Sequence, residues 1–133
     1  IAIEGLARAG DATKVAAIEA ALQAEINESV QLAGRFAVAA LSNASLEPIG
    51  DLLTKPRLRD QARQYLIELA AGRTGAFSRY VQDPEPSVRI DVADILGLAG
   101  DPAALPLIEP LTKDTDPQVV KAADRAVARL RAV

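Results

Sequence analysis

The chain contains no cysteine, histidine, methionine or tryptophan among its 133 residues. These absences exclude disulfide bonds, thiolate nucleophiles, imidazole bases and the usual zinc-ligand sets. Aromatic residues are also scarce, with two phenylalanines and two tyrosines. The core volume must therefore come from alanine, leucine, isoleucine and valine, which suit close helix packing better than a large ligand cavity.

Long apolar runs and strand-like patterns are missing as well. No apolar stretch approaches the ~18 residues of a membrane span, and no charged-then-apolar leader begins the chain. β-Branched and aromatic residues do not alternate with polar ones over any strand-length segment. We therefore expect an all-α protein without membrane insertion, with the cytoplasm favoured as its location. Because the chain starts at Ile1 and has no methionine, we also expect it to be a fragment.

A repeated motif near the C-terminus predicts the architecture. The segment Asp83–Arg89 returns as Asp114–Val120, and an alanine-rich run follows each copy. Gly10 and Asp11 also match Gly100 and Asp101, at a spacing of 90 residues that corresponds to three repeats. The resulting period of about 30 residues is typical of stacked helical hairpins.

Helix start and stop signals divide the chain into nine helices. Around residue 100, for example, a glycine suits the position after a helix end, the following aspartate suits an N-cap, and Pro102 suits a first turn. The predicted helices are 1–9, 12–25, 29–42, 46–54, 57–71, 74–82, 86–99, 102–113 and 117–131. They form one orphan second helix followed by four hairpins, in a single domain over 1–133. The predicted fold class is an all-α, right-handed α–α superhelix, that is, a solenoid.

These motifs resemble the HEAT repeats, in particular the short bacterial type that also occurs in phycobilin lyases. The resemblance is carried by Asp83–Arg89 and by Leu96–Pro102, and it is sharpest in residues 83–130. It implies a HEAT-like solenoid, and it implies that Arg89 pairs with Asp83. Because the chain lacks the residues that usually carry catalysis, we expect a scaffold that binds a protein or peptide without a cofactor.

The second helices of the hairpins have two distinct faces at 100° per residue. The predicted inward positions are Val30, Gly34, Ala37, Val38 and Leu41 in one helix, and Leu58, Ala62, Tyr65, Leu66 and Leu69 in the next. The opposite face should form a concave partner-binding surface. The predicted partner-binding residues are Leu32, Phe36, Arg59, Arg63, Gln64, Ile90, Asp94, Lys121 and Arg125. No catalytic or metal-ligating residue is predicted.

Leu32 and Phe36 stand where this pattern favours polar side chains. One interpretation makes them an exposed apolar anchor for a partner, and the other places them in contact with a neighbouring helix. Asp83, Asp101 and Asp116 each begin a helix, so we interpret them as N-caps and not as metal ligands.

Positive charge gathers in residues 55–79, which carry six Lys or Arg against two Asp or Glu in a chain of net charge −3. Arg59 and Arg63, beside Arg57, with Arg35 and Arg89 at flanking positions, could grip phosphates or an acidic peptide. Alternatively, these arginines tie neighbouring repeats together. The charge is modest for a nucleic-acid-binding domain, so nucleic acid is a minor hypothesis.

Three functional hypotheses follow. The first is a protein-binding scaffold, the second a bilin-handling protein suggested by the resemblance, and the third weak nucleic-acid or phosphate binding through residues 55–79. We also expect apolar faces at both ends of the stack, which would join further repeats or self-associate.

Overall fold

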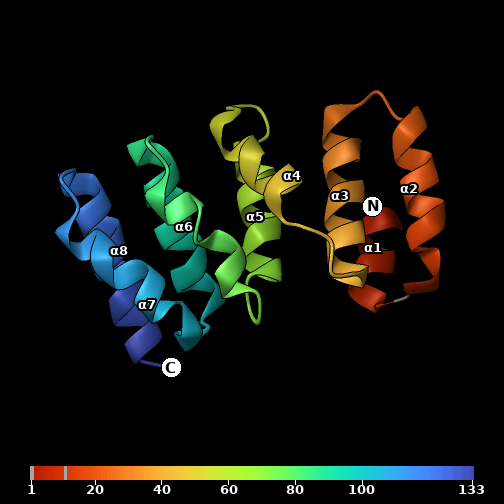
Figure 1. Cartoon of the computed structure of the whole chain (residues 1–133). Coiled ribbons are helices and arrows are strands. Elements are labelled where there is room, and N and C mark those ends of the chain that lie inside the picture. The colour runs from red at the N-terminus through yellow and green to blue at the C-terminus, as the bar shows by residue number, and fades with distance from the viewer. Residues whose placement is uncertain (1, 11) are drawn as a thin grey trace. The chain divides into compact units, whose positions relative to one another are not determined.

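The computed structural model describes residues 2–10 and 12–133, and every regular element in these ranges is helical (Figure 1). The α-helices are α1 (Ala2–Ala9), α2 (Val15–Ala24), α3 (Glu28–Leu41), α4 (Glu47–Gly50), α5 (Arg59–Leu69), α6 (Pro86–Ala99), α7 (Leu105–Ile108) and α8 (Pro117–Arg131). The 3-10 helices are η1 (Ala12–Lys14), η2 (Asp51–Thr54), η3 (Thr74–Phe77), η4 (Tyr80–Gln82), η5 (Pro102–Ala104) and η6 (Glu109–Lys113). Each of the nine predicted segments holds one α-helix or a run of short helices, so the all-α class is confirmed.

The helices group into two compact units, Ile1–Tyr65 (the first unit) and Leu66–Val133 (the second unit), and α5 crosses the boundary. In the first unit, α3 packs against both α1 and α2. In the second unit, α8 packs against α6, as one second helix packs on the next. Because α1 meets α3 in the same way, it takes the place of the predicted orphan second helix. The single repeat domain over 1–133 stays a prediction.

The first helices of the hairpins are shorter than the sequence pattern suggests. The segment predicted at 102–113 consists of η5, α7 and η6. Proline has no backbone N–H to donate, and its ring clashes with the preceding turn. Pro106 stands at the start of α7, and α7 ends at Ile108, two residues before Pro110. Proline therefore explains why this segment breaks into 3-10 pieces.

Left-handed glycines and aspartate caps mark the helix ends as predicted. Gly10 and Gly100, which stand at matching positions, both have φ of 76°. This conformation costs little for glycine and closes a helix C-terminus. Asp101 caps η5 through Ala103 N (3.0 Å). Asp11, its predicted counterpart, lies outside the described residues.

Small residues bring α6 and α8 close together. A Cβ atom on Gly97 would lie 2.9 Å from Ala126 Cα, which is closer than side-chain carbons approach. The α8 side of this contact is formed by buried apolar residues: Val119, Ala123, Ala126, Val127 and Leu130. The core has few aromatic residues, and its small side chains let the helix backbones pack closely instead.

No helix within 2–10 and 12–133 is long and apolar enough to cross a bilayer.

Candidate functional site

Leu32 and Phe36 are buried, with 0% and 2% of their surface exposed, so their predicted exposure is wrong. The Phe36 ring stacks on Tyr65 of α5, with ring centroids 4.4 Å apart and planes 15° apart. The Arg8 guanidinium of α1 also lies over the Phe36 ring, 5.3 Å from its centroid. Contact with neighbouring helices, the alternative interpretation, explains this pair. Neither side chain offers an anchor to a partner.

The predicted inward positions are less completely buried in α3 than along residues 58–69. All five predicted positions from Leu58 to Leu69 are buried, whereas in α3 Val30, Val38 and Leu41 are only half-buried. Helix α3 packs against α1 as well as α2, so a wider part of its surface is covered than one stripe. The orphan helix is thus the physical reason for the error at Leu32 and Phe36.

A polar network surrounds the Tyr65 hydroxyl in the first unit. Tyr65 Oη donates to Glu4 Oε2 (2.5 Å) and accepts from Gln61 Nε2 (3.1 Å). Gln61 also bonds Ser29, accepting from Oγ at 2.8 Å and donating to the carbonyl at 3.0 Å. Burial, followed by the hydrogen bond with Glu4, raises the pKa of Tyr65 to about 12. The Tyr65 hydrogen bond in turn lowers the pKa of Glu4. These bonds join α1, α3 and α5.

The predicted arginine pair of α5 lies at a partly covered surface. Arg59 and Arg63 are half-buried, Gln64 is exposed, and Arg59 Nη1 lies 3.2 Å from Asp60 Oδ1. The basic segment 55–79 is divided between the two units. Binding of nucleic acid or bilin stays a prediction.

Arg89 ties two successive turns of the second unit together. Its Nε and Nη2 donate to the Asp114 carboxylate at 2.9 and 3.1 Å, while Nη1 donates to the carbonyls of Asp83 (2.7 Å) and Pro84 (3.1 Å). Arg89 therefore bonds Asp83, as the resemblance implies, but through the backbone carbonyl and not through the carboxylate. Asp83 uses its carboxylate to accept from Glu85 N at 2.9 Å. The Arg89 hydrogen bond lowers the pKa of Asp114.

The other turn carboxylates serve the backbone. Asp101 also accepts from Gly72 N at 2.8 Å, and this bond, followed by that from Ala103 N, lowers its pKa. Asp116 caps α8 by accepting from Gln118 N at 2.8 Å. Capping is thus confirmed for Asp101 and Asp116 and wrong for Asp83, because the N-cap of α6 is Glu85, two residues later, and the helix begins at Pro86. Within the described ranges, no three His, Cys, Asp or Glu residues gather as metal ligands.

Four predicted site residues come together on α6 and α8. Asp94 and Arg125 occupy the same position in successive second helices, and Asp94 Oδ1 lies 3.3 Å from Arg125 Nη2. Ile90 and Lys121 stand one turn before them, half-buried and exposed respectively. Leu98, one turn after Asp94, is 45% exposed. We call these five residues the α6–α8 strip.

Leu98 was missed by sequence reasoning. Its signal was the four-residue spacing from Asp94, which places both side chains on one helix face.

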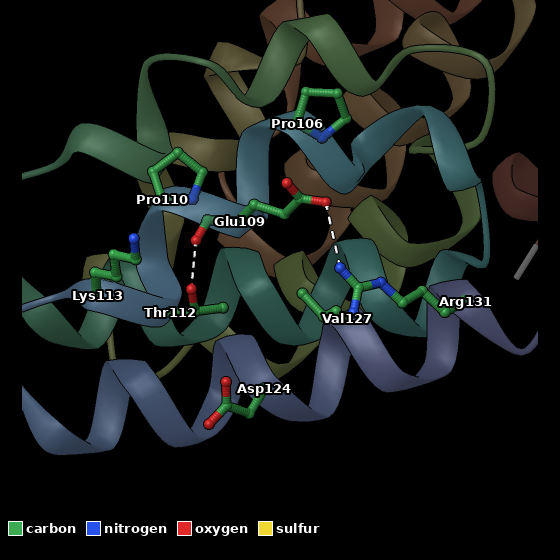
Figure 2. Close-up of a pocket in the computed structure, with 8 residues that line it drawn as sticks. All are labelled: Pro106, Glu109, Pro110, Thr112, Lys113, Asp124, Val127 and Arg131. Atoms are coloured by element: carbon green, nitrogen blue, oxygen red, sulfur yellow. Dashed lines mark hydrogen bonds and ion pairs between the residues drawn. The ribbon is translucent and has the colours of Figure 1, made fainter.

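A hollow of about 690 Å³ opens between the first-helix segment α7–η6 and α8 (Figure 2). Its lining residues are Pro106, Glu109, Pro110, Thr112, Lys113, Asp124, Val127 and Arg131. Figure 2 shows Arg131 and Glu109 directed toward each other, with Nη2 and Oε1 3.7 Å apart. Asp124 stands where α6 has the fully buried Ala93. The expected apolar face at this end of the stack stays a prediction, and charged side chains stand among the residues that line the hollow.

The α6–α8 strip lies in a segment with a family match, since residues 74–132 match the HEAT repeats. HEAT repeats generally mediate protein–protein interactions and are typically not catalytic. No curated protein matches the chain. The phycobilin-lyase-like subtype stays a prediction.

Proposed function

We propose that the chain is a non-catalytic interaction module that binds a protein or peptide on the α6–α8 strip. The observation that carries the proposal is the Asp94–Arg125 pair beside Leu98. This ion pair aligns equivalent positions of two HEAT second helices on one accessible surface. Leu98 adds exposed apolar area to the same surface.

The composition of the strip supports protein binding. Interface energy concentrates in a few apolar or arginine side chains that are bordered by polar groups. Leu98 and Ile90 supply apolar area, while Asp94, Lys121 and Arg125 supply charges of both signs. The Arg125 side chain is 52% exposed, so a partner carboxylate has access to it.

Leu98→Asp tests the proposal. Wild-type protein immobilised on beads is used to retain partners from an extract of the source cells, and each retained protein is purified and titrated by calorimetry. We expect Leu98→Asp to weaken the partner's affinity by about tenfold or more, because a charge replaces an apolar contact. Val133→Asp is the matched control, since Val133 is also an exposed aliphatic residue.

The expected result is loss of affinity in Leu98→Asp with unchanged affinity in Val133→Asp. Far-UV circular dichroism and thermal melting establish that both variants fold. Equal affinity of wild type and Leu98→Asp for every retained partner would contradict the α6–α8 strip as the binding surface.

A further inference from the structure

A groove in the first unit lies between the turn before α3 and the turn before α5. It consists of a hollow of about 470 Å³, lined by residues 26–29, Arg57 and Leu58, and one of about 190 Å³, lined by Glu28, Leu52 and residues 55–58. The two hollows share Glu28, Arg57 and Leu58, so they lie next to each other. We call it the turn groove.

Three of the four turns that precede a second helix have the same internal bond. In each, a carboxylate accepts from the backbone N–H two residues later: Asn27 N to Glu25 Oε1 at 2.8 Å, Glu85 N to Asp83 Oδ1 at 2.9 Å, and Asp116 N to Asp114 Oδ1 at 2.9 Å. The turn before α5, residues 54–58, contains no carboxylate. It carries Lys55 and Arg57 instead, so its charge is reversed.

Because of this reversal, the first unit lacks an ion pair that the second unit has at the equivalent position. There, Arg89 binds the carboxylate of the following turn, Asp114, and the carbonyl of its own turn, Asp83. In the first unit, Gln31 stands at the position of Arg89, and its Nε2 donates to the carbonyl of Glu25 in the same way. The following turn offers no acid to complete the pattern. The turn groove is the open counterpart of the Arg89–Asp114 contact.

The groove has unpaired positive charge beside apolar surface. Lys55 and Arg57 are exposed, and neither side chain forms an ion pair with any residue in the described ranges. The Glu25 carboxylate is already bonded to the N–H groups of Ile26 and Asn27. Ile26, at the rim, is 92% exposed. An exposed isoleucine close to these two cations favours a ligand that carries both an apolar group and a negative charge.

We propose that the turn groove binds a segment of a partner protein in which an acidic side chain adjoins an apolar one. The acidic side chain supplies the carboxylate that the turn before α5 lacks, and Arg57 and Lys55 bind it. The apolar side chain packs on Ile26 and on Leu52, which lines the smaller hollow. This surface lies in the first unit and is independent of the α6–α8 strip.

A peptide fits the groove better than a nucleic acid. Strands of nucleic acid are held by a track of cations and by aromatic rings that stack on bases. Two cations line the turn groove, no aromatic residue does, and the acidic Glu28 lines both of its hollows.

Fluorescence anisotropy with synthetic peptides tests the proposal on the intact chain. The probe is a fluorescein-labelled peptide that alternates aspartate or glutamate with leucine. Its controls are a peptide with serine in place of leucine, a peptide with lysine in place of the acids, and labelled oligothymidine. We expect the acidic, leucine-containing peptide to bind most tightly and to lose affinity at high salt.

Variants then locate the site. We expect Arg57→Glu and Lys55→Glu each to weaken binding by about tenfold, because a like charge replaces an attractive one. Ile26→Ser should weaken binding several-fold. Arg35→Glu is the matched control, because Arg35 is an exposed arginine of α3 that does not line the groove, and it should bind as wild type does.

Three results would overturn the proposal: no binding of the acidic peptide by wild type, unchanged binding by Arg57→Glu, or tighter binding of the lysine peptide or oligothymidine. Leu98→Asp separates this proposal from the proposed function. It should keep wild-type affinity for the acidic peptide, and loss of that affinity would assign the peptide to the α6–α8 strip.

Discussion

Arg89 holds Asp114, a residue 25 positions further along the chain, through two hydrogen bonds of 2.9 and 3.1 Å. Asp114 stands in its turn where Asp83 stands in the turn before Arg89's own helix. One side chain therefore binds the backbone of one turn and the carboxylate of the next. The pair is well covered, with 13% and 11% of the two side chains exposed. It links successive helical repeats at their turns, outside the apolar contact of α6 with α8.

The first prediction concerns the stability that this link provides. Arg89→Ala should lower the free energy of unfolding by about 2–4 kcal/mol, because it leaves the Asp114 carboxylate and two turn carbonyls without their donor. Urea denaturation followed by circular dichroism measures the change.

Arg125→Ala is the control for that prediction. It removes an arginine from another ion pair between the same two repeats, but the Arg125 side chain is 52% exposed. An exposed pair contributes about 0–1 kcal/mol. If Arg125→Ala destabilises the protein as much as Arg89→Ala does, the coverage of the Arg89–Asp114 pair does not set its strength.

Local signals in the sequence predicted the helices well. Aspartate caps such as Asp101 and Asp116 and the left-handed Gly100 act within a few residues, so their positions can be read directly from the chain. The partner of Arg89 could not be read in this way. Asp83 and Asp114 are chemically equal candidates, and only the stacking of the repeats brings the second one within reach.

The α3 surface shows the same limit for apolar side chains. A helical wheel places Leu32 and Phe36 opposite the predicted inward stripe, and that placement assumes a single packed face. The covering of Phe36 by Tyr65 and Arg8 depends on α5 and α1, which are distant in sequence. In α6, by contrast, Asp94 meets Arg125, its equivalent in α8, because the alignment of the two positions follows from the period alone.

The second prediction concerns the close approach of α6 and α8. Gly97→Ala should destabilise the protein by about 1–3 kcal/mol, because the added Cβ meets the Ala126 backbone, which cannot move aside easily. This cost outweighs the gain of about 1 kcal/mol that alanine normally brings inside a helix. Thermal melting measures the net effect.

Gly5→Ala gives the opposite sign and serves as the control. Gly5 lies inside α1, and an added Cβ there meets nothing within 4 Å. We expect a gain of about 0.5–1 kcal/mol from helix propensity alone. A stabilising Gly97→Ala would show that α8 adapts to the methyl group and that the small residue is not required.

The third prediction concerns the pH dependence that Tyr65 confers. Its pKa is raised from near 10 to about 12, so the folded protein favours the neutral hydroxyl that donates to Glu4. A raised pKa stabilises the fold fully below pH 10, and this contribution is lost as the pH rises toward 12.

Tyr65→Phe should lower the free energy of unfolding by about 1–2 kcal/mol at neutral pH, since it removes a hydrogen bond to a carboxylate. The difference between wild type and Tyr65→Phe should then shrink between pH 10 and 12, because only the wild type carries the group that titrates. Urea denaturation of both proteins across this range measures the difference, and Tyr80, common to both, cancels in the comparison. A difference that stays constant to pH 12 would mean that the Tyr65 hydroxyl titrates alike in the folded and unfolded chains, and the hydrogen bond to Glu4 would then not favour its neutral form.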